Sequence, residues 1–102
     1  MVSGQTHGKL TRADRALVAT YHEAKLADLI EHVRAGLARY DAGELSVFDL
    51  DEIIHHFTLA ARELWKFCGA AGGQISQAAT TLKVWGEEGP DWWEIGEHKR
   101  PR

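Results

Sequence analysis

Residues 26–68 read LADLIEHVRAGLARYDAGELSVFDLDEIIHHFTLAARELWKFC, and this stretch holds two helical patterns separated by a short break. On both sides of the break, apolar residues recur every three or four positions, which is the spacing of one face of an α-helix. Within the break, Gly43 suits the left-handed residue that follows a helix, and Ser46 with Asp49 suits the start of the next one. A break this short allows only an antiparallel return. The stretch therefore predicts an antiparallel helical hairpin.

The limits of both helices follow from flanking signals. Thr11 offers a capping oxygen with an acid, Asp14, three residues later, so the first helix is predicted over 11–42. The second helix is predicted over 47–68, because the flexible run GAAGG begins at Gly69. Strand signals are nearly absent, so the sequence predicts an all-α fold. Its predicted parts are a flexible N-terminus (1–10), the helical hairpin (11–68), and a C-terminal region (69–102) with a glycine-rich break, a short helix at about 75–85 and a Trp-rich acidic tail.

Composition bounds the class of protein. The chain has 102 residues, 44% hydrophobic and 26% charged, which fits one ordinary domain. Its formal net charge is -3, with 12 basic and 15 acidic residues, so it lacks the basic footprint that nucleic-acid binding needs. One cysteine, Cys68, forms no intrachain disulfide, and neither a signal peptide nor a membrane-spanning run is recognisable. A cytoplasmic protein is expected, with neither membrane nor nucleic acid as a partner.

The apolar positions predict where the helices pack. Leu26, Ile30, Val33, Leu37 and Tyr40 alternate spacings of four and three, as in a coiled-coil contact, and are expected to pack on the second helix. On a helical wheel, the second helix has one broad apolar face. The predicted core of the hairpin, or of a dimer of hairpins, consists of Leu26, Ile30, Val33, Leu37, Tyr40, Leu50, Ile54, Phe57, Ala61 and Leu64.

The first helix is long enough to overhang the second. A separate apolar stripe, with Leu10, Leu17 and Tyr21, lies on this overhang. Two interpretations remain open, since either the third apolar segment or another chain can cover the stripe. The second helix is also apolar over almost half its circumference, and a single neighbouring helix cannot cover so wide a face. A homodimer that forms a four-helix bundle is therefore expected.

The second helix also carries a possible metal-binding pattern. Glu52 and His55 form a Glu-x-x-His pair, and His56 follows directly. Metal-binding bundles direct such pairs inward between helices, where they meet further carboxylates. Here the wheel places Glu52 and His55 on the side away from the core and His56 at its margin. A solvated polar face is the favoured interpretation, and no cofactor is expected.

The C-terminal tail is rich in tryptophan. Trp85, Trp92 and Trp93 stand among acidic residues and glycines. The rings either close the end of the hairpin or anchor a linear segment that binds a partner protein, for which an acidic tail favours a basic partner. Because Pro90 and Asp91 are expected to start only a short turn, at least one of Trp92 and Trp93 is predicted to be solvent-accessible.

No pattern of catalytic residues is recognisable. The run GAAGGQ lacks the lysine and hydroxyl of a phosphate-binding loop and follows a helix rather than a strand. Cys68 lies on the core face, more than three helical turns from His55 and His56, so these residues do not form a nucleophile and base within one chain. The sequence therefore predicts a small, non-enzymatic protein interaction module or accessory regulatory subunit. The alternative is a carboxylate-histidine metal-binding bundle, and the third is a DNA-associated regulator, which lacks a basic recognition helix.

Overall fold

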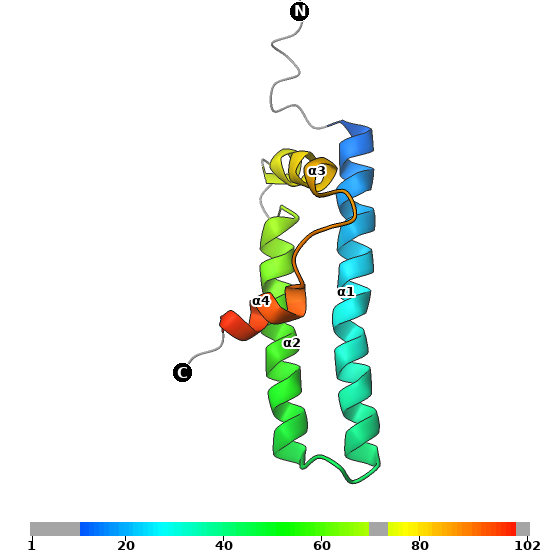
Figure 1. Cartoon of the computed structure of the whole chain (residues 1–102), viewed down its shortest axis with the longest axis vertical. Coiled ribbons are helices and arrows are strands. Elements are labelled where there is room, and N and C mark those ends of the chain that lie inside the picture. The colour runs from blue at the N-terminus through cyan, green and yellow to red at the C-terminus, as the bar shows by residue number, and fades with distance from the viewer. Residues whose placement is uncertain (1–10, 70–73, 100–102) are drawn as a thin grey trace, which may run out of the picture.

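The computed structural model describes residues 11–69 and 74–99. Within them the chain forms four α-helices and no strand, so the prediction of an all-α fold is confirmed. The helices are α1 (Arg12–Asp41), α2 (Val47–Phe67), α3 (Gln74–Trp85) and α4 (Trp92–His98). Helices α1 and α2 run antiparallel side by side, α3 crosses beside the N-terminal part of α1, and α4 crosses α2 near its middle (Figure 1). The predicted flexible N-terminus and Leu10 lie outside the described residues.

Capping side chains fix the starts of both long helices. Thr11 Oγ1 accepts a hydrogen bond of 3.0 Å from the backbone N–H of Asp14. At α2, Ser46 and Asp49 each accept from the other's backbone N–H at 3.0 Å, which completes a capping box. Between the helices, Gly43 has a φ of 80°, a left-handed conformation that side chains disfavour. The structure therefore confirms the predicted roles of Gly43 after the first helix and of Ser46 and Asp49 at the start of the second.

Small and branched residues form the contact between α1 and α2. Leu29 and Leu64 are fully buried. At Gly36 the helices approach so closely that a Cβ atom would lie 2.9 Å from Cδ1 of Ile53. Close packing of this kind fixes the register of the pair. The side of α1 that faces α2 thus runs through Leu29 and Gly36.

This contact corrects the predicted packing of α1. Ile30 and Leu37 were expected to pack on α2, but they are 41% and 44% exposed in the chain. Leu29 and Gly36 take their place, each one residue earlier and therefore about 100° around the helix. Apolar spacing did not reveal this, because Leu29 and Ile30 are both apolar and Gly36 contributes no apolar signal.

Helix α3 covers the overhanging part of α1. Val18, Ala79 and Leu82 are buried in the same core cluster. At the edge of the contact, Lys83 Nζ donates to Asp14 Oδ1 at 3.0 Å, and this bond is the main reason that the pKa of Asp14 is lowered. The third apolar segment thus folds back on the overhang, as one of the two interpretations had it, but it buries Val18 and leaves Leu17 of the predicted stripe 37% exposed. None of the helices among residues 11–69 and 74–99 has the length and apolar character needed to cross a membrane.

Candidate interaction surface

The side of the α1–α2 pair that carries α4 is closed by a stack of three rings. The Trp93 ring lies parallel to His32, with ring centroids 4.1 Å apart, and parallel to His56, with centroids 3.7 Å apart. His56 Nε2 lies 2.7 Å from the carbonyl oxygen of Trp93, which can only accept, so this nitrogen donates. His56 Nδ1 lies 3.3 Å from Glu97 Oε1. One buried histidine of α2 thus holds both ends of α4.

The other two tryptophans of the C-terminal region, Trp92 and Trp85, also pack within the fold. Trp92 is 7% exposed, and its Nε1–H donates to the hydroxyl of Tyr21 at 2.7 Å. Trp85 stacks on Phe67 with ring centroids 5.2 Å apart. At least one of Trp92 and Trp93 was predicted to be solvent-accessible; Trp92 is buried, and Trp93 is partly buried. Of the two interpretations of the tail, the structure shows rings that pack within the fold, with Trp85 near the end of the helical pair and Trp92 and Trp93 near its middle.

Helix α4 itself was not predicted. Asp91 Oδ1 accepts from the backbone N–H of Trp93 at 3.0 Å, and this cap starts a helix of seven residues rather than a single short turn. The helix rests on α2 at Gly96, where a Cβ atom would lie 2.7 Å from Cβ of Ala60. A helix of two turns is too short for a periodic apolar signal, and its stabilising contacts are distant in sequence.

The residues of the Glu-x-x-His pattern lie on different sides of α2. His55 is exposed, and its Nδ1 lies 3.5 Å from Asp51 Oδ2. His56, predicted at the margin of the core, is buried and faces α4. Glu52 is exposed. Among the described residues, no three His, Cys, Asp or Glu side chains cluster as metal ligands would.

Cys68 is poorly suited to nucleophilic chemistry. Its side chain is buried at the end of α2. Burial raises the pKa of the thiol from 9.0 to about 11. Because the thiolate is the reactive form, the neutral thiol at physiological pH behaves as a small apolar side chain.

Residues 11–69 and 74–99 leave one face of the α1–α2 pair uncovered. We call it the open face, and its large side chains are between 40% and 55% exposed. They are Ile30, Leu37 and Tyr40 on α1 and Val47, Ile54 and Trp65 on α2. Leu26, Val33 and Ala61 share the helical side of these residues and are partly buried.

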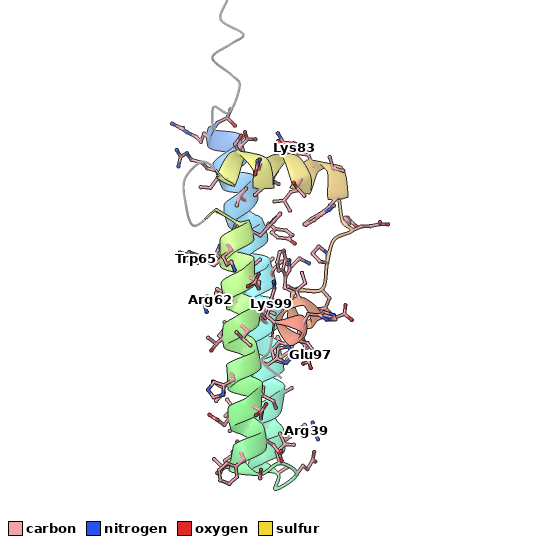
Figure 2. The ribbon with its side chains drawn as sticks, turned by 90° about the vertical axis from the view of Figure 1, so that its left-hand side faces the viewer. Arg39, Arg62, Trp65, Lys83, Glu97 and Lys99 are labelled. Atoms are coloured by element: carbon pink, nitrogen blue, oxygen red, sulfur yellow. The ribbon has the colours of Figure 1, made fainter. Side chains whose placement is uncertain are left out.

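Helical geometry places the open face opposite α4. Ile30 and Ile54 each precede by two residues a histidine that stacks on Trp93, His32 and His56 respectively. Two residues correspond to about 200° around a helix, so both isoleucines point away from α4. Figure 2 shows the same division, with Trp65 projecting to the side opposite Glu97. Most of the predicted core of a dimer therefore lies on this face.

Comparisons of the chain with protein-family models, curated proteins and solved structures give no match.

Proposed function

We propose that the chain is a non-enzymatic protein interaction module that works as a homodimer, in which two α1–α2 hairpins meet through their open faces as a four-helix bundle. The observation that carries the proposal is the open face, where both long helices expose large apolar side chains that neither α3 nor α4 covers. Large contiguous apolar patches are rare on monomers and mark interaction sites.

The pattern of the open face suits helix packing. On α1, Ile30, Val33, Leu37 and Tyr40 follow one another at intervals of three and four residues, as residues at the centre of helical bundles do. Two aromatic side chains, Tyr40 and Trp65, stand at opposite ends of the face, and aromatic residues are enriched at protein interfaces. A second copy offers the same broad, elongated surface, which is the form of a twofold dimer contact.

Sedimentation equilibrium at micromolar concentration tests the proposal. We expect the wild-type chain to be a dimer, and Leu37→Glu or Ile54→Glu to be monomers, because a charge at the centre of the contact is desolvated without a partner. Both side chains are more than 40% exposed in the single chain, so helical circular dichroism should be retained. Trp65→Ser, at the most exposed position of the face, is a milder version of the same test.

Two exposed apolar residues outside the open face provide matched controls. Val84 on α3 is 80% exposed, and Phe48 is 79% exposed. Val84→Glu and Phe48→Glu should therefore remain dimeric. A wild-type chain that sediments as a monomer and melts cooperatively would overturn the proposal, as would loss of the dimer in the control variants alone.

A further inference from the structure

We infer that the two hairpins of the dimer lie with their loops at opposite ends, so that each α1 packs antiparallel on the α1 of the second copy. This inference rests on the proposed dimer and adds its orientation. It is carried by the distribution of charge along the hairpin, which differs between the half that contains the loop and the half that contains the free ends of α1 and α2.

The loop half, residues 28–56, has an excess of acidic side chains. Its acidic residues are Asp28, Glu31, Asp41, Glu44, Asp49, Asp51 and Glu52, and its basic residues are Arg34 and Arg39. Ion pairs within this half, such as Arg39 Nε with Glu44 Oε1 at 3.3 Å, leave the excess of negative charge unchanged.

The far half, residues 12–27 and 57–68, has the opposite excess. Its basic residues are Arg12, Arg15, Lys25, Arg62 and Lys66, and its acidic residues are Asp14, Glu23 and Glu63. Lys83 of α3 adds a further positive charge beside Asp14. Arg62 projects from α2 on the same side as Trp65, at the edge of the open face (Figure 2).

The remaining acidic residues lie toward the other face. Glu87, Glu88 and Asp91 belong to the connection between α3 and α4, and Glu94 and Glu97 belong to α4. Lys25 and Asp28 lie on this side of α1 as well, because one pocket is lined by both of them together with Asp91, and another by Lys25 with Glu87 and Glu88. Without Lys25 and Asp28, the loop half still has six acidic and two basic residues, and the far half has four basic and three acidic residues. The charge difference between the two halves of the hairpin therefore remains.

Two face-to-face arrangements satisfy twofold symmetry. With the axis along the helices, both loops lie at one end, α1 packs on the partner's α2, and the two acidic halves face each other. With the axis across the helices, the loops lie at opposite ends and each acidic half faces the basic half of the other copy. Opposed like charges disfavour the first arrangement, and complementary charges favour the second.

The second arrangement makes a specific contact. On α1 the open face extends from Leu26 to Tyr40, so an axis across its middle passes near Val33. Leu26 of one copy then lies against Tyr40 of the other. With loops at the same end, Tyr40 would instead lie near Val47 of the other copy.

A spin-label distance in the intact dimer tests the orientation. A label at Glu44→Cys in a Cys68→Ala background reports only the separation between the two copies, since Cys68 is the single cysteine. Glu44 is eleven residues from Val33, so at 1.5 Å per residue loops at opposite ends place the labels about 30 Å apart or more, and loops at one end place them within about 20 Å. A short distance overturns the orientation and leaves the dimer standing, whereas absence of any intermolecular distance contradicts the dimer itself.

The salt dependence of dimerisation is an independent test of the orientation. Raising sodium chloride from about 25 to about 300 mM screens charge, so the dissociation constant of the opposite-end dimer should rise on the order of threefold. A constant that falls or stays unchanged overturns the inference. Arg62→Glu should weaken the opposite-end dimer, whereas it would tighten a dimer in which the two basic halves face each other.

Discussion

At the scale of single residues, adjacent positions on one helix have opposite surroundings. His55 is exposed beside Asp51, whereas His56 is buried beneath the Trp93 ring and bonded to its carbonyl oxygen. The helical wheel places His55 away from the core and His56 only at its margin, so the sequence pattern does not reveal that His56 is buried. The difference comes from α4, whose Trp93 is 37 residues beyond His56 in the sequence and packs on His56 but not on His55.

The two histidines provide a matched pair of variants. His56→Ala removes a ring stack and a hydrogen bond and leaves the Trp93 carbonyl without its partner, so we expect a loss of about 2 kcal/mol in the free energy of unfolding. His55→Ala should change it by less than about 0.5 kcal/mol, as is usual at exposed sites. Urea unfolding followed by tryptophan fluorescence measures both. Equal effects would mean that the stack does not hold α4.

At the scale of helices, the elements that are specified locally are those that the sequence predicts best. Thr11 and Ser46 start α1 and α2 through bonds to residues three positions away, and such short-range chemistry is visible in a sequence. The face of α1 that packs on α2 was predicted less well, because Gly36 allows the close approach without contributing apolar surface. Helix α4 was missed because its stability comes from Ala60, His56 and Tyr21, none of which is near it in sequence.

Two helical glycines test this account of helix packing. A Cβ atom at Gly96 would lie 2.8 Å from backbone atoms of Ala60, which cannot move aside, whereas at Gly36 it would meet the flexible end of Ile53 at 2.9 Å. Helix propensity alone predicts that alanine stabilises either site by about 1 kcal/mol. We expect Gly96→Ala to destabilise the protein by about 1–3 kcal/mol through overpacking.

Gly36→Ala should be near neutral, because a small rotation of Ile53 relieves the contact and the gain in propensity offsets it. Chemical denaturation of the two variants gives the comparison. If Gly96→Ala were the more stable of the two, α4 would not rest on Ala60 as closely as the structure shows.

At the scale of the whole molecule, the two faces of the α1–α2 pair have different roles. One face is occupied by α4, which buries Trp92 and encloses His56, while α3 covers the overhanging part of α1. The other presents Ile30, Ile54 and Trp65 to solvent. The sequence predicted more apolar surface than one chain covers, and the structure shows on which side that surplus lies.

Tryptophan fluorescence distinguishes these two faces. Of the four tryptophans, Trp65 is 55% exposed and lies on the open face, so we expect its emission to shift to the red when dilution dissociates the dimer. Trp65→Phe should abolish the concentration-dependent shift, and Trp85→Phe should retain it, because Trp85 packs on Phe67 within one chain. A shift that persists in Trp65→Phe would place the contact elsewhere.

The bond between Trp92 and Tyr21 joins residues that are 71 positions apart. During translation, α1 and α2 leave the ribosome before α4 has been made, so the hairpin first exists with His56 and Ala60 uncovered as well as the open face. Contacts of such long sequence separation form late in folding. Until synthesis reaches Gly96, a nascent chain therefore exposes two apolar surfaces, the open face and the side that later binds α4. Docking of α4 covers the second surface, so only the open face stays available to another chain.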